Sequence, residues 1–148
     1  MSKFQIIVGT VYGSTIELAD ECQDFLIDQG HQCEWLETPE LCDLDPSASI
    51  LIMTASTGMG DIPDGLMSLY CDLLDEEPDL THQRFALVGL GDSSYAYFNG
   101  AAKRLFEVLS KLNAQLLVEP LYVDANYDPE PAEPVMRWLA SWVDQSKG

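Results

Sequence analysis

Short apolar runs alternate with amphipathic segments along the whole chain, and this alternation constrains the fold more than any other feature. Apolar runs of four to eight residues are typical of strands buried in a parallel sheet. We expect five strands, at Phe4–Gly9, Gln32–Leu36, Ile50–Thr54, Phe85–Leu90 and Leu116–Val123. Apolar residues at helical spacing predict helices at Thr15–Gln29, Pro63–Asp75 and Gly100–Leu112, and a last helix with Val135, Trp138, Leu139, Trp142 and Val143 on one face.

Five βα units in succession predict an α/β fold. In the second unit, an acidic loop follows the strand Gln32–Leu36. The connections of these units should be right-handed, which gives a doubly wound parallel sheet with helices on both faces. No repeat or linker interrupts the alternation, so we expect a single domain over residues 1–148. The chain begins in an apolar strand without a charged leader, and a cytoplasmic location is therefore the expectation.

The net charge of −18 is spread unevenly, because no Lys or Arg occurs between Phe4 and Gln83. Such a charge makes nucleic acid and anionic membranes poor partners and favours a monomer. An acidic surface can simply keep a protein soluble. It can also steer a basic partner toward a site by complementary potential.

Cysteines and histidines give no sign of a metal site. Cys22, Cys33, Cys42 and Cys71 include no C-x-x-C pair, which supports neither a disulfide framework nor a zinc site. We expect these cysteines to be free thiols, most of them structural. His31 and His82 are expected at ordinary surface positions.

Ligands of doubly wound sheets bind beyond the carboxyl ends of the strands, which directs attention to the loops there. The loop after the first strand reads Thr10-Val11-Tyr12-Gly13-Ser14-Thr15 and opens a helix. Helix N–H groups and these hydroxyls could hold a phosphate monoester. The same residues could equally be ordinary helix caps. No lysine follows as a P-loop nucleotide site requires.

Two further loops follow the third and fourth strands. Residues 56–60 place two glycines around a methionine, which permits close approach to a flat ligand, although the segment alone is also a generic turn. Residues 89–99 are rich in small residues and then become aromatic at the sheet edge. A planar aromatic ligand stacked on Tyr95 would cover this apolar surface.

These stretches together resemble flavodoxins, over essentially the whole chain. Thr10, Gly13, Ser14 and Thr15 match the family's phosphate loop, while Tyr12 stands where a small hydroxyl residue is usual. The segment GLGDSSYAYFN, at 89–99, is the most specific match. The continuous fifth strand resembles the short-chain bacterial group, and Met59 or a glycine lies where many members carry tryptophan.

The resemblance implies a flavodoxin-like five-stranded sheet of order 2-1-3-4-5, the arrangement known to hold FMN at its switch point. It assigns FMN contacts to Thr10, Val11, Tyr12, Gly13, Ser14 and Thr15, to Ser56, Thr57, Gly58, Met59 and Gly60, and to Leu90, Gly91, Asp92, Tyr95, Phe98 and Asn99. The implied function is single-electron transfer between a flavodoxin/ferredoxin-type NADP reductase and an acceptor protein, which dock through the acidic face. The chain would then be a carrier without catalytic residues.

Three alternatives stand beside this interpretation. An FMN-dependent NAD(P)H:quinone oxidoreductase has the same fold and would turn over without a partner protein. A non-redox module that has lost the cofactor is suggested only by Tyr12. A phosphate-accepting receiver domain is disfavoured by Thr10, Thr54 and the lysine-free segment 116–134.

Overall fold

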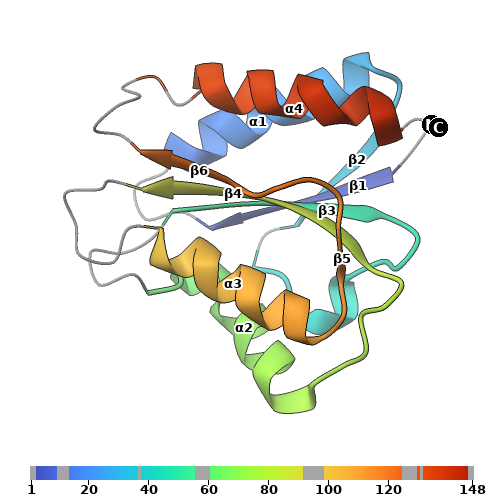
Figure 1. Cartoon of the computed structure of the whole chain (residues 1–148), viewed down its shortest axis with the longest axis vertical. Helices are drawn as coiled ribbons and strands as arrows, with labels where there is room; N and C mark the ends of the chain where they lie inside the picture. The colour runs from blue at the N-terminus through green and yellow to red at the C-terminus, as the bar shows by residue number, and fades with distance from the viewer. Residues whose placement is uncertain are drawn as a thin grey trace.

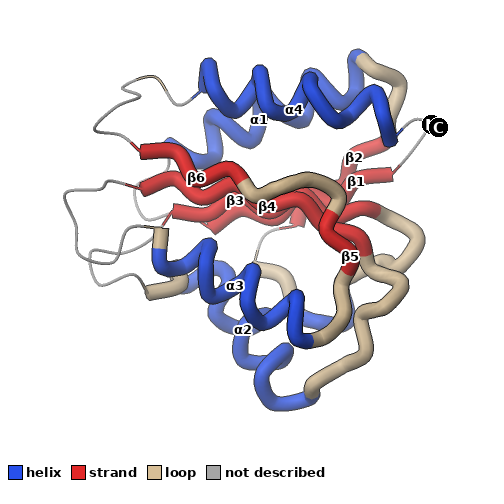
Figure 2. Tube along the Cα trace, viewed as in Figure 1, coloured by secondary structure: helices blue, strands red, loops and turns tan. Residues whose placement is uncertain are grey.

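A computed structural model describes residues 3–9, 14–36, 38–55, 61–91, 99–124, 130 and 132–146. Its strands are β1 (Lys3–Gly9), β2 (Gln32–Leu36), β3 (Ser49–Ala55), β4 (Arg84–Gly91), β5 (Gln115–Leu116) and β6 (Leu121–Asp124). They form one parallel sheet of order β2-β1-β3-β4-β5, in which β6 also pairs with β4 (Figure 2). The predicted doubly wound sheet and its order are confirmed.

In the part of the chain that the structure describes, four α-helices cover the two faces of this sheet. They are α1 (Ser14–Asp28), α2 (Asp64–Glu76), α3 (Gly100–Lys111) and α4 (Ala132–Ser146). Helices α1 and α4 lie on one face, and α2 and α3 on the other (Figure 1). After β2 comes the expected acidic loop, whose described part contains a single 3-10 turn, η1 (Leu41–Asp43), in place of a crossover helix.

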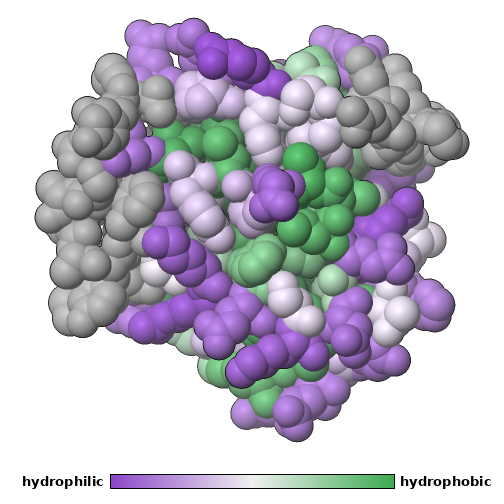
Figure 3. Space-filling view, in the orientation of Figure 1, coloured by the Kyte–Doolittle hydropathy of each residue, from purple (hydrophilic) through white to green (hydrophobic). Residues whose placement is uncertain are grey.

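The fifth strand position is shared by two short strands, whereas we expected one strand over Leu116–Val123. β5 pairs with the start of β4 and β6 with its end. Pro120 lies between them and has no N–H to donate to a ladder, which explains the interruption. Figure 3 shows apolar surface over this edge, between the more hydrophilic surfaces of α4 and α3. A broken edge strand with proline also limits pairing with other chains.

Both faces of the sheet are buried, which is why the strands read as continuous apolar runs. Alternate strand residues point to opposite faces, so that Ile7, Ile50 and Ile52 pack toward α2 and α3. Ile6, Leu51 and Met53 pack toward α1 and α4. Each face therefore has its own apolar core.

His31 is buried, and the expectation of a surface position is wrong. It follows α1 directly, and its ring meets Phe4 edge-on at 5.2 Å between centroids. Only 4% of its surface is exposed. Trp142 contacts the same Phe4 ring at 6.1 Å, in agreement with the predicted packing role of the last helix. None of the helices in the described part of the chain is long and apolar enough to cross a membrane.

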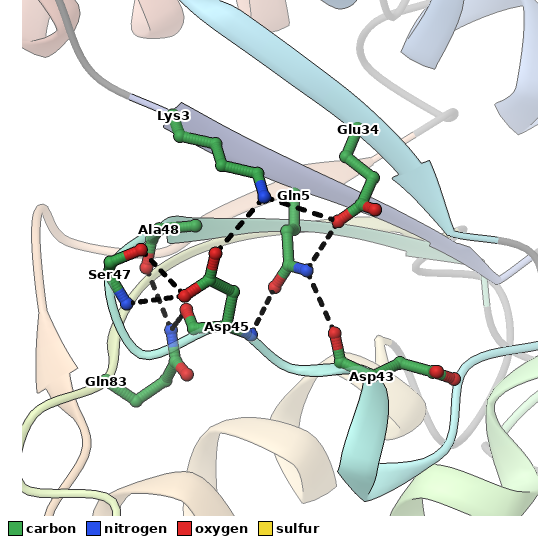
Figure 4. Close-up of polar contacts among 8 residues, drawn as sticks. All are labelled: Lys3, Gln5, Glu34, Asp43, Asp45, Ser47, Ala48 and Gln83. Atoms are coloured by element: carbon green, nitrogen blue, oxygen red, sulfur yellow. Dashed lines mark hydrogen bonds and ion pairs between the residues drawn. The ribbon is translucent and has the colours of Figure 1, made fainter.

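A polar network fastens the connection between β2 and β3 to the amino end of the sheet (Figure 4). Buried Gln5 donates from Nε2 to Glu34 Oε1 at 2.7 Å and to the Asp43 carbonyl at 2.9 Å, and it accepts from the Asp45 N–H at 2.9 Å. Asp45 also receives hydrogen bonds from the hydroxyl and N–H of Ser47, which, with Lys3 at 3.1 Å, lower the pKa of its carboxyl to about 2. This network lies at the opposite end from the predicted ligand loops.

Candidate functional site at the carboxyl edge of the sheet

The carboxyl ends of four strands lie side by side in one row. Gly9 of β1 pairs with Thr54 of β3, which pairs with Gly89 of β4, which in turn pairs with Tyr122 of β6. The three predicted loops follow β1, β3 and β4 within two residues of this row. The fold therefore starts all three loops from a single edge.

The predicted site residues divide into two groups. Outside the described residues lie Thr10, Val11, Tyr12, Gly13, Ser56, Thr57, Gly58, Met59, Gly60, Asp92, Tyr95 and Phe98. Among the described ones, Ser14 and Thr15 open α1, Leu90 and Gly91 end β4, and Asn99 precedes α3. The structure thus brings these five to the same edge, while every contact with FMN stays a prediction.

The first turn of α1 contains the last two residues of the predicted phosphate loop, Ser14 and Thr15. A 15-residue helix such as α1 presents unpaired N–H groups and the positive end of its dipole at its amino terminus. Thr15 is almost fully buried there, with 2% of its surface exposed. The arrangement fits a phosphate held by backbone amides and hydroxyls, because no Lys or Arg occurs between residues 4 and 83.

Glycines at the strand ends make room for neighbouring segments. A Cβ on Gly9 would lie 2.6 Å from Leu66 Cδ1, so α2 packs directly against the end of β1. A Cβ on Gly89 or Gly91 would lie 2.8 Å from Asn99 Oδ1. Asn99 therefore occupies the space that side chains on β4 would fill.

Asn99 joins three elements at this edge. Its backbone is left-handed, with φ 53° and ψ 33°, and its carbonyl accepts from the Lys103 N–H in α3 at 3.0 Å. Its Nδ2 donates to the Val123 carbonyl of β6 at 3.4 Å. The residue is 1% exposed, and its Oδ1 accepts no hydrogen bond from the described residues. A buried oxygen of this kind needs a donor, and an N–H of a bound ligand or of the loop at 92–98 would fit it.

An ion pair connects the segments that follow the second and third predicted loops. Arg104 Nη1 in α3 lies 3.3 Å from Oδ1 of Asp61, which comes directly after residues 56–60. The two side chains are 48% and 56% exposed. Arg104 was not predicted from the sequence, although a cationic partner for Asp61 had to be Lys3 or a residue from 84 onward.

Two of the four cysteines, Cys22 and Cys33, are at least partly buried, whereas Cys42 and Cys71 are exposed. All four cysteines are free. Burial, and secondarily the charge of Glu21, raises the pKa of the Cys22 thiol to about 12, and burial raises that of Cys33 to about 11. High pKa values disfavour the reactive thiolate. Among the described residues, no three His, Cys, Asp or Glu side chains gather as a metal site.

Sequence comparison places these features in a known family. The family model described as Flavodoxin matches residues 6–138. The chain belongs to the flavodoxin family. Flavodoxin YqcA of Escherichia coli K12 is 35% identical over 144 residues, which are 96% of this flavodoxin and 97% of the relative. Protein MioC of the same strain is 33% identical over 147 residues, or 99% and 100% of the two chains.

Solved structures agree with the sequence comparison. A single-residue mutant of flavodoxin from Pseudomonas aeruginosa superposes with a TM-score of 0.88 at 32% identity, covering 99% of both chains. Oxidised flavodoxin 1 from Bacillus cereus gives a TM-score of 0.82 at 27% identity, over 97% and 98% of the two chains. The predicted resemblance to short-chain bacterial flavodoxins is confirmed. These matches support an FMN-binding electron-transfer protein and do not favour the quinone oxidoreductase.

Proposed function

We propose that this flavodoxin is a single FMN-binding domain that carries one electron at a time from an NADP-linked flavodoxin reductase to an acceptor protein in the cytoplasm. One observation supports the site above all others. The ends of β1, β3 and β4 and the start of α1 lie at a single edge, in the strand order that positions an FMN site.

The residues at this edge divide the work of holding the cofactor. The α1 amino terminus and the hydroxyls of residues 10–15 bind the phosphate, without a cation. Residues 56–60 and 90–99 would hold the isoalloxazine ring, and Tyr95 would stack on it. Bound FMN supplies the one-electron chemistry, while the chain holds it, orients it and excludes water.

Asn99 anchors the carboxyl end of the third predicted loop, residues 89–99. It fixes the start of α3 to β6 and fills the space beside Gly89 and Gly91. Its buried Oδ1 offers the loop or the ligand one acceptor for an N–H or O–H donor. We therefore assign Asn99 a positioning role, in which the side chain sets where residues 90–98 can lie.

Partner proteins approach an acidic carrier through complementary charge. Electron-transfer complexes have small interfaces and short lifetimes. Electrostatic attraction can raise their rate of encounter without making the complex tight. The net charge of −18 suits a partner with a basic docking surface. A nicotinamide substrate site is not part of the proposal, since the reductase supplies the electrons.

Titration of the purified apoprotein with FMN tests the proposed function. We expect one FMN per chain, with quenched flavin fluorescence, followed by two resolved one-electron steps during anaerobic stepwise reduction. Failure to take up FMN would contradict the proposal. Steady turnover of NADPH with a quinone and no added protein would instead identify an oxidoreductase of the same fold.

A further inference from the structure

A cavity of about 950 Å³ opens at the β2 side of the carboxyl edge. Its walls come from the ends of β1 and β2, from the outer side of α1 and from Gly65 near the start of α2. Val8, Ile16, Trp35 and Leu36 supply apolar surface, and Asp20 and Gln23 supply polar groups. Of the residues that the structure describes, those that line the cavity lie outside the three predicted FMN loops.

The sheet itself explains why the cavity exists. β2 is an edge strand that ends at Leu36, paired with Ile7, whereas β1 continues for two more residues to Gly9. On the side of β1 that faces β2, Val8 and Gly9 therefore have no partner in β2, while their other side pairs with β3. Trp35 and Leu36 are only half-buried at the rim that results.

An exposed apolar side chain at this rim is unusual for a helix as acidic as α1. Ile16 leaves 43% of its surface exposed and lines the cavity. Around it on α1, the exposed acids are Glu17, Asp20, Glu21 and Asp24. An apolar hollow within a charged rim is the usual anatomy of a protein docking site, where a few central contacts carry most of the binding energy.

Charge decides which kind of partner fits. The rim is anionic and residues 4–83 contain no Lys or Arg, so a second copy of this chain, itself at −18, would be repelled. A volume of about 150 Å³ already holds a benzene-sized group, so the cavity has room for a large apolar side chain. A partner protein that suits this cavity thus carries an exposed apolar side chain surrounded by Lys or Arg.

We propose that this cavity is an anchor site for the redox partner protein, which inserts an apolar side chain while its basic residues meet the acids of α1. The inference rests on the proposed electron-carrier function and places docking beyond the immediate edge of the flavin. Val8 and Ile16 flank residues 10–13 in the sequence, so a partner anchored here would lie next to the predicted phosphate loop.

Matched substitutions on α1 test the anchor. Ile16→Gln removes the apolar rim, and Ile27→Gln is its control, because Ile27 is 51% exposed on the same helix and does not line the cavity. Asp20→Asn removes the charge in the cavity, and Asp24→Asn removes an equal charge outside it. All four positions are exposed, which keeps the fold intact.

The measurement is the dissociation constant of the FMN-loaded protein with an NADPH-dependent flavodoxin reductase, by calorimetry, together with KM and kcat for its reduction. We expect Ile16→Gln to raise the dissociation constant and KM about fivefold, the effect of losing one central contact. Asp20→Asn should raise both about threefold at low salt and less at high salt. The two controls should change them less than twofold, and FMN affinity should not change.

Equal effects of Ile16→Gln and Ile27→Gln, or no effect of either, would overturn the anchor and leave the carrier function standing. A loss of FMN binding in Ile16→Gln would also overturn it, because the cavity would then serve the cofactor. If the wild-type apoprotein does not bind FMN, the carrier function fails and the anchor fails with it.

Discussion

At the scale of single residues, Asn99 combines two properties that the sequence alone does not separate. Its left-handed backbone is one that asparagine tolerates better than most residues, and its side chain reaches the Val123 carbonyl of β6. A glycine would satisfy the backbone but not the contact. The residue therefore serves both the turn into α3 and the support of the edge.

Substitution of Asn99 should separate these two contributions. Asn99→Gly keeps the backbone conformation and loses the buried hydrogen bond, so the free energy of unfolding should fall by about 1 kcal/mol. Asn99→Ala adds strain at positive φ and should cost about 1 kcal/mol more. Urea unfolding of the two apoproteins measures the difference, and FMN titration should show weaker binding in both. Wild-type stability and FMN affinity in Asn99→Gly would remove the positioning role.

At the scale of elements, much of the fold follows from sequence pattern because periodicity records burial. Strands buried on both faces read as unbroken apolar runs, and the four helices show one apolar stripe each. The split fifth strand was missed because apolar content masked the local effect of Pro120. Burial of His31 was missed because the contact with Phe4 is long-range and leaves no local signal.

For the candidate site too, local sequence motifs could be predicted and long-range contacts could not. The loop motifs indicated the edge because three of them follow predicted strands, whereas each one alone would also suit a helix cap or a turn. The supports of the edge, Asn99 against β6 and Arg104 with Asp61, depend on residues that are 24 and 43 positions apart. Such pairs can be predicted only once the order of the strands and the packing of α3 are known.

The connection between β2 and β3 should lose stability in acid through Asp45. Hydrogen bonds from Ser47, and then the charge of Lys3, hold the folded pKa of Asp45 at about 2, below the unfolded value of about 4. Its carboxylate therefore stabilises the fold above about pH 4, and this contribution is lost as the pH falls through about 2. Thermal melts of Asp45→Asn between pH 5 and 2 should show a weaker pH dependence than the wild type. Asp75→Asn, an exposed change on α2, is the control, and an identical pH profile in the two variants would contradict the assignment.

The Arg104–Asp61 pair should matter to the cofactor more than to the fold. Exposed ion pairs contribute about 0–1 kcal/mol to stability, so Arg104→Gln should change the unfolding free energy little. It should weaken FMN binding about threefold, because the pair joins the segments behind two FMN loops. Arg137→Gln, which breaks the 2.9 Å pair with Glu133 on α4, is the control and should leave FMN binding unchanged. A double-mutant cycle with Asp61→Asn that gives no coupling in FMN affinity would rule out this link.

At the scale of the whole molecule, charge is segregated along the chain. Lys3 is the only Lys or Arg before residue 84, and the other six lie at residue 84 or beyond. α1 and α2 are therefore acidic without internal compensation, while α3 carries Lys103, Arg104 and Lys111. The resulting asymmetry would orient the molecule in the field of the proposed basic partner before contact.

Ionic strength should consequently control the rate of reduction by the reductase. Attraction between exposed charges is screened over about 10 Å at 0.1 M salt and about 3 Å at 1 M. The second-order rate constant should fall about tenfold between 0.05 M and 0.5 M NaCl, as stopped-flow absorbance at the flavin band would record. Photoreduction of the same protein, which needs no protein partner, serves as the control and should not show this fall. A reduction rate that does not change with salt would mean that the acidic residues serve solubility alone. A partner protein anchored at α1 would then bind through apolar contact, without electrostatic steering.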